Sequence, residues 1–237
     1  MTPDNKALFH DHAKRVAPRE ACALLIMEGR REVLVICENR SPLMDQFEIA
    51  AEDYAKAELR GEIIGVVHSH PVTNPMPSEA DKVACEATGL EWHIVAVITG
   101  QWHSFKPSGY RAPLVGRTWA HGLMDCYSIV RDYYDEILGI KLIDFERQFD
   151  WWNKGDNLYL DNFQKAGFFE VKDGSLRKHD VILMQILSPV TNHAAVYLGN
   201  ELILHHIHKR LSCREIYGGM WAKCTTKVVR HKSFENG

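Results

Sequence analysis

The sequence has 237 residues, 46% hydrophobic and 25% charged, so it can fill a globular core and is neither a disordered chain nor a disulfide mini-protein. A net charge of −3 leaves no excess of basic groups for neutralising phosphates, which argues against nucleic acid as a partner. No apolar stretch approaches the roughly 18 residues that cross a bilayer, and the polar start of the chain carries no secretory signal. We therefore expect no membrane span and synthesis in the cytoplasm.

The chain has one clear break, at residues 106–113, where two prolines and a glycine oppose regular structure. We predict a first domain over residues 1–105, a linker over 106–113 and a second domain over 114–237. The six cysteines are scattered without a CxxC pair, which indicates reduced thiols rather than a disulfide framework or an all-thiolate zinc site.

The first domain is predicted to be α/β. Thr2 followed by Pro3 can cap a helix that ends near Pro18. The apolar runs 21–27 and 32–37 indicate a hairpin. A helix over 50–59, a buried strand over 63–68, a helix from Ser78, and strands over 93–98 and 101–105 follow.

The second domain is predicted to be α+β, because one helix precedes several strands. Apolar residues recur at spacings of three and four from Cys126 to Leu138, which predicts a helix that Gly139 ends. Strands are predicted over 181–187, 192–198 and 202–207, the last two flanking a Gly-Asn turn.

The segment His68-Ser69-His70-Pro71 carries the first chemical signal. Two imidazoles at i and i+2 share one face at the end of a strand, so both can reach one cation. Asp81, on the next helix, adds an oxygen, and two nitrogens and one oxygen with an open fourth position suit a catalytic Zn²⁺ ion. Ser78-x-x-Asp81 is also a pattern that caps a helix, and the two uses can coexist.

HxHP followed by SxxD resembles the JAMM (Mov34/MPN) metallopeptidase family over most of the first domain. The resemblance implies a mixed sheet with flanking helices, and zinc held by His68, His70 and Asp81. It also implies that Ser78 stabilises the oxyanion and that Glu20, just before the first predicted strand, is the general base. The alternative for Glu20 is a solvated surface residue.

Asp125-Cys126 opens the predicted helix of the second domain, and the helix dipole there is expected to lower the pKa of the thiol. A nucleophilic cysteine needs a base, and His193 at a strand start is the best candidate. A further polar group should orient that imidazole. A two-residue turn pairs His193 with His206, whereas a bulge or longer loop puts His205 on its face.

This order of residues resembles the NlpC/P60 family of papain-like cysteine peptidases. The resemblance implies a papain-like α+β fold, Cys126 as nucleophile, His193 as base and His205 as the orienting residue. Members commonly cleave the γ-D-glutamyl to diamino acid bond of peptidoglycan stem peptides, so peptidoglycan peptides are the expected partners. The segment Trp119-Ala-His-Gly122 departs from the family's usual tyrosine and paired glycines, which leaves the substrate contacts open.

The two domains in one chain of this length resemble a family of siphophage tail assembly proteins. The resemblance implies a phage or prophage tail-tip protein with peptidase activity in tail assembly and cell-wall penetration. Other phage tail-tip proteins are then its partners. Its expected location is the host cytoplasm during assembly, with the virion tail tip as a second. The alternatives are a non-catalytic assembly protein with vestigial sites and a host JAMM-type isopeptidase.

Overall fold

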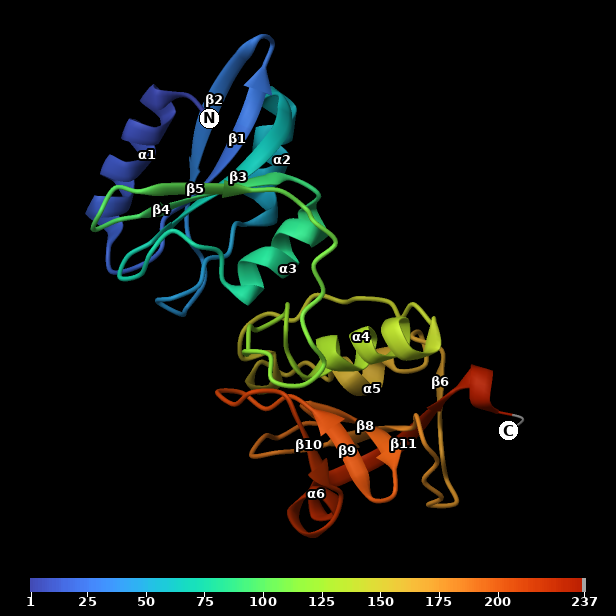
Figure 1. The fold of residues 1–237 in the computed structure, drawn as a ribbon. Helices are drawn as coiled ribbons and strands as arrows, with labels where there is room; N and C mark the ends of the chain where they lie inside the picture. The colour runs from blue at the N-terminus through green and yellow to red at the C-terminus, as the bar shows by residue number, and fades with distance from the viewer. Residues whose placement is uncertain (236–237) are drawn as a thin grey trace. The chain divides into compact units, whose positions relative to one another are not determined.

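A computed structural model describes residues 1–235 and divides the chain into two compact units, Met1–Arg111 and Ala112–Gly237 (Figure 1). The division falls inside residues 106–113, which have no helix or strand. Each unit has its own sheet and its own core. Within the described part of the chain, no helix has the length and apolar character that crossing a membrane requires.

The N-terminal unit is a five-stranded mixed sheet in the order β2-β1-β3-β4-β5, in which β3 and β4 run parallel. This arrangement confirms the predicted α/β class with flanking helices. Its elements are α1 (Pro3–Val16), β1 (Cys22–Glu28), β2 (Arg31–Cys37), α2 (Ala51–Arg60), β3 (Glu62–His70), α3 (Glu79–Thr88), β4 (Glu91–Ala96) and β5 (Trp102–Phe105).

Helices cover both faces of this sheet, because β1 is apolar on both of its sides (Figure 1). Leu25 packs in one core cluster with Phe9 of α1. Leu24 and its neighbours at alternate positions pack in the other cluster with Ala57 of α2 and Cys85 of α3. Since Val66 belongs to this second cluster, alternation along β3 directs His68 and His70 toward the α3 side.

The C-terminal unit is a six-stranded antiparallel sheet in the order β10-β9-β8-β7-β11-β6, which confirms the predicted α+β class. The sequence patterns missed β6, β10 and β11. Its elements are α4 (Cys126–Leu138), η1 (Trp151–Asn153), α5 (Leu158–Asn162), β6 (Phe168–Glu170), β7 (Val181–Met184), β8 (His193–Gly199), β9 (Leu202–His205), β10 (Cys213–Ile216), α6 (Gly219–Cys224), β11 (Thr225–His231) and η2 (Lys232–Phe234).

Helix α4 packs its buried side on the sheet, with Ile129 and Val130 in one cluster with Leu183 and Val196. As predicted, the helix ends at Gly139, whose φ of 67° is the left-handed conformation that glycine adopts most readily. The other sheet face carries a separate cluster built around Trp221 of α6. The start of α4 lies next to the start of β8, since Cys126 contacts the backbone of Asn192.

Candidate active sites

The end of β3 and the start of α3 bring the three predicted metal ligands of the N-terminal unit together. Nε2 of His68 lies 3.2 Å from Nε2 of His70 and 3.2 Å from Oδ1 of Asp81. Nε2 of His70 lies 3.5 Å from Oδ2 of Asp81. All three side chains are buried.

This donor set fits a zinc ion. For metal–ligand distances of about 2.0–2.2 Å, the corners of a tetrahedron lie about 3.3–3.6 Å apart, close to the separations observed. Nδ1 of His70 lies 2.8 Å from the carbonyl oxygen of Asn74. A hydrogen bond from Nδ1 to that oxygen would leave the lone pair of Nε2 directed at the metal position.

Ser78 is the N-cap of α3 and forms a capping box with Asp81. Its hydroxyl donates to Oδ2 of Asp81 at 2.8 Å and accepts from the backbone N–H of Asp81 at 3.1 Å. Burial would raise the pKa of Asp81, but His68 and hydrogen bonds from His68, His70 and Ser78 hold it well below its usual range. The helix cap that the SxxD pattern predicts is therefore present, and it fixes the orientation of the Asp81 carboxylate.

Glu20 lies two residues before the start of β1 and beside the histidine pair. Its neighbour Ala21 accepts a hydrogen bond from the backbone of Ser69 at 3.1 Å, which places Glu20 against the end of β3. Its side chain is buried, with 8% exposed, so it is not a solvated surface residue. Burial raises the pKa of Glu20 to about 7, against the opposing charges of His68 and His70. A carboxyl group with such a pKa can accept and return a proton near neutral pH.

Cys126 opens α4, directly after the N-cap Asp125. Its sulfur lies 3.0 Å from the hydroxyl of Tyr159 and 3.8 Å from the carbonyl oxygen of Asn192. Burial raises the pKa of the thiol to about 12, and the carboxylate of Asp125 adds to the rise. The expected low pKa is therefore wrong, because loss of hydration outweighs the field of the helix start.

A bulge in the β8–β9 hairpin decides which histidine faces His193. The register shifts between Tyr197 and Gly199, so that Ala195 lies opposite His205. Nε2 of His193 then lies 3.1 Å from Nδ1 of His205. His206 instead contacts the carbonyl oxygen of Arg210 through Nε2 at 3.1 Å.

His193 is buried and electrically neutral at ordinary pH. Burial, helped by the nearby rings of His205 and His206, lowers its pKa to about 3. Its Nε2 faces His205, which leaves Nδ1 as the nitrogen that can serve the thiol. The resting site therefore holds a neutral thiol and a neutral imidazole, not an ion pair.

Cys126 and His193 line one cavity of about 290 Å³. Asn192 and Asp125 supply polar groups to its wall. Its size and aromatic lining are typical of a small-molecule or peptide pocket. The aromatic and imidazole side chains around it are Trp119, His121, Trp151, Trp152, Tyr159, His193 and His208.

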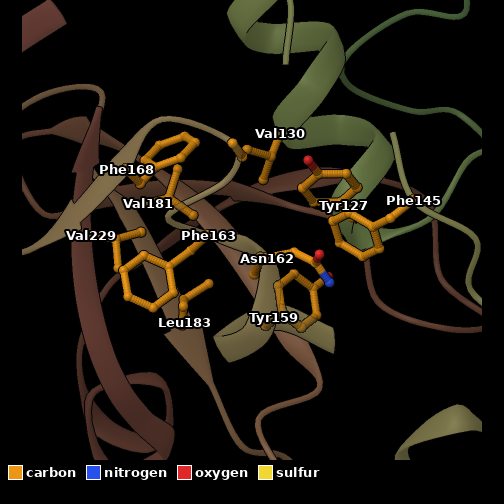
Figure 2. A pocket seen from close by; sticks show the side chains of 12 residues that line it. Tyr127, Val130, Phe145, Tyr159, Asn162, Phe163, Phe168, Val181, Leu183 and Val229 are labelled. Carbon is orange, nitrogen blue, oxygen red and sulfur yellow. The ribbon is translucent and has the colours of Figure 1, made fainter. Parts of the chain in front are cut away.

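Tyr159 and Arg147 are site residues that the sequence patterns did not indicate. The ring of Tyr159 also lines a small apolar core cavity of about 20 Å³, next to Tyr127 and Phe145 (Figure 2). Arg147 donates from Nε to Oδ2 of Asp125 at 2.8 Å. Arg147 lies in an irregular segment and Tyr159 in the five-residue helix α5, and neither segment is long or regular enough to show a periodic signal.

Two family models match the chain. Residues 3–112 match prokaryotic homologs of the JAB domain. Residues 115–230 match the NlpC/P60 family. Each match covers one of the two compact units and agrees with its fold class.

Two phage proteins are similar over nearly their whole length. Tail tip assembly protein K of Escherichia phage N15 is 38% identical over 224 residues, which covers 93% of this chain and 91% of the relative. The protein of the same name from Escherichia phage lambda is 40% identical over 186 residues, covering 78% and 90%. A JAB1/MPN domain protein from Archaeoglobus fulgidus is 22% identical with a TM-score of 0.31, covering 46% of this chain and 87% of that one.

Proposed function

Because this chain belongs to the family of phage tail tip assembly protein K, we propose that it is a tail-tip protein with two peptidase sites. The C-terminal unit is a cysteine peptidase that cleaves peptidoglycan stem peptides at the γ-D-glutamyl to diamino acid bond. The N-terminal unit is a zinc-dependent peptidase or isopeptidase. The observation that carries the proposal is that Cys126 and His193 line one cavity, with His205 against the far nitrogen of His193.

The cysteine reaction starts from a neutral thiol, because burial raises the pKa of Cys126 and lowers that of His193. Nδ1 of His193 takes the thiol proton as the sulfur attacks the scissile carbonyl carbon. The imidazolium then gives this proton to the leaving amine as the C–N bond breaks. Water, deprotonated by His193, hydrolyses the thioester and restores the thiol.

The tetrahedral oxyanion needs donors close to the sulfur. The N–H groups of Tyr127 and Ser128 already donate to Asp125, at 3.0 and 2.9 Å, and serve the helix cap. The hydroxyl of Tyr159, 3.0 Å from the sulfur, is the better placed donor. Tyr159 is accordingly assigned to the oxyanion.

The cysteine site is tested with purified protein and defined muropeptides, with products identified by mass spectrometry. Replacing Cys126 with Ala abolishes cleavage, and replacing His193 with Ala is nearly as severe because the thiol then has no base. Cys224→Ala is the matched control and retains wild-type cleavage, because Cys224 lies outside the cavity lining. Cleavage by Cys126→Ala at the wild-type rate would assign the activity elsewhere in the chain.

In the N-terminal site, His68, His70 and Asp81 would hold the zinc ion, and Ser78 holds the carboxylate of Asp81 in place. When bound there, zinc would supply Lewis acidity toward the scissile carbonyl and would lower the pKa of a water molecule. Glu20 would accept a proton from the attacking water and return it to the leaving group. For Ser78 to help stabilise the oxyanion, its hydroxyl must turn away from Asp81.

The zinc site is tested by metal analysis and by the processing of co-expressed tail-tip proteins. Wild-type protein binds one zinc per chain, and His68→Ala loses it. Glu20→Gln keeps the metal and loses processing, since an amide cannot accept the proton. Loss of metal from Glu20→Gln would make Glu20 a ligand, and absence of zinc uptake by wild-type protein would refute the site.

A non-catalytic role in assembly is the second candidate, because the relatives are named for tail tip assembly. It predicts that Cys126→Ala phage assemble normal tails and inject DNA at the wild-type rate. A host isopeptidase is disfavoured, since the phage relatives match both units.

A further inference from the structure

One ring nitrogen of His205 lies at hydrogen-bond distance from His193, and the other faces the carboxylate of Glu215. The side chain of His205 is fully buried, and Nδ1 lies 3.1 Å from Nε2 of His193. Among residues 1–235, Nε2 of His205 has no hydrogen-bond partner within normal distance. The nearest acidic oxygen, Oε2 of Glu215, lies 3.6 Å away.

The proton on His205 decides whether His193 can act as a base. For Nδ1 of His193 to accept the thiol proton, its own proton must sit on Nε2 and be donated to Nδ1 of His205. His205 must then carry its proton on Nε2, which requires an acceptor there. A proton on Nδ1 of His205 instead would place the proton of His193 on Nδ1 and block the reaction.

Glu215 is held where it can be that acceptor. Its Oε2 accepts from the indole N–H of Trp221 at 3.0 Å, and its Oε1 accepts from Arg210 at 2.8 Å. Strand β10 pairs with β9, with Cys213 opposite His205, so Glu215 two residues on lies on the same sheet face. His205 and Arg210 lower the pKa of Glu215 against the effect of burial, which keeps the carboxylate ionised.

We propose that Glu215 is a positioning residue that accepts the Nε2 proton of His205 and so keeps Nδ1 of His193 free for Cys126. A shift of a few tenths of an ångström brings the 3.6 Å separation to hydrogen-bond length. The role in turnover rests on the proposed cysteine peptidase, whereas the proton position on His205 does not depend on it.

The competing hypothesis is that the cluster of His205, Cys213 and Glu215 binds a cation. Ligand atoms of His205, Cys213 and Glu215 lie within 4.8 Å of one another. A cation on Nε2 of His205 would force the proton onto Nδ1, which is the arrangement that stops His193 from acting as a base. Oε2 of Glu215 has a second lone pair, so it can accept the proton of His205 beside the hydrogen bond from Trp221.

The test combines histidine-labelled ¹⁵N NMR with muropeptide kinetics on the full chain. We expect the Nε2–H form of His205 in wild-type protein and the Nδ1–H form in Glu215→Leu. The Leu variant should lose kcat by about 10- to 100-fold with little change in KM. Glu215→Gln should retain most activity, because its amide oxygen can still accept.

Two control variants separate this role from simple loss of an ion pair. Glu170→Leu removes a 2.8 Å pair with Lys227 in the same sheet and should leave both readouts unchanged. Cys213→Ala should also be neutral. If Cys213→Ala lost both a bound metal and activity, the cluster of His205, Cys213 and Glu215 would be a metal site, and the proposal would be refuted.

The wild-type spectrum is decisive even if Glu215→Leu does not fold. An Nδ1–H form of His205 in wild-type protein would overturn the proposal, as would a folded Leu variant with unchanged protonation. Absence of muropeptide cleavage by wild-type protein, with the Nε2–H form present, would refute the peptidase and leave the Glu215 contact standing.

Discussion

A buried ion pair between Asp125 and Arg147 lies beside Cys126 in the C-terminal site. Asp125 accepts from two backbone N–H groups of α4 and from the side chain of Arg147. Burial would raise the pKa of Asp125, but Arg147 and the cap hydrogen bonds hold it below its usual range. Cys126 therefore follows an N-cap carboxylate that is held by a buried ion pair as well as by the cap hydrogen bonds.

Replacing Arg147 with Leu should destabilise the C-terminal unit by about 3–5 kcal/mol, because it leaves the buried carboxylate of Asp125 unpaired. Urea unfolding measures the change. The control is Arg131→Leu, which removes a pair with the exposed Asp144 and should cost less than about 1 kcal/mol. Equal costs for the two variants would show that Asp125 is hydrated or protonated in the folded protein.

Two of the buried histidines, His193 and His206, should make the C-terminal unit sensitive to acid. Burial lowers the pKa of His193 to about 3 and that of His206 to about 4. Both histidines bind protons more readily in the unfolded chain than in the folded protein. Their contribution to the free energy of unfolding is therefore complete above about pH 6.5 and is lost as the pH falls toward these pKa values. The expected slope is about 1.4 kcal/mol per pH unit for each histidine.

The measurement is the free energy of unfolding between pH 7 and 4. His206→Gln should reduce the slope of the unfolding free energy against pH by about 1.4 kcal/mol per pH unit, because glutamine does not titrate. An unchanged slope would mean that His206 is already protonated or hydrated in the folded state.

Helix α3 links stability to the candidate zinc site through its first turn. Ser78→Ala removes the cap hydroxyl and should cost about 1 kcal/mol of stability in the N-terminal unit. It should also weaken zinc binding by about 10-fold, because the carboxylate of Asp81 loses a donor that orients it. Unfolding and competition with a chelator measure the two effects.

The matched control is Thr2→Ala, since Thr2 caps α1 by accepting from the N–H of Asn5 at 3.3 Å. It should cost a similar amount of stability and leave zinc affinity unchanged. Equal zinc affinity in the two variants would contradict a positioning role for Ser78.

In the whole molecule, each unit has a complete sheet and core, so we predict that the two fold independently. The connecting segment is tied to α3, because the backbone N–H of Tyr110 donates to Glu86 at 2.9 Å. A protease of low specificity should cut between Lys106 and Arg111 and release two folded fragments. Glu86→Ala should speed this cleavage; resistance of that variant, or unfolding of either fragment, would indicate a shared core.

The sequence alone determined the features whose signals lie in short windows. Pro3 at a helix start, Gly139 at a helix end and the HxHP…SxxD spacing each predict a local conformation or a ligand set. The fold class of both units and the family resemblance followed from such patterns. Strand β6 was missed because its three residues are too few to show a pattern, and β10 was missed because its two charged residues, Arg214 and Glu215, are adjacent and interrupt any alternation.

Only the tertiary structure decided the features that depend on distant residues. The bulge after Tyr197 selects His205 over His206, and a register cannot be read from the strands separately. Burial among segments far along the chain raises the pKa of Cys126 and outweighs the local effect of the helix start, even though the hydrogen bond with Tyr159 lowers it. Desolvation sums over everything that packs around a group, and so it exists only once the chain has folded.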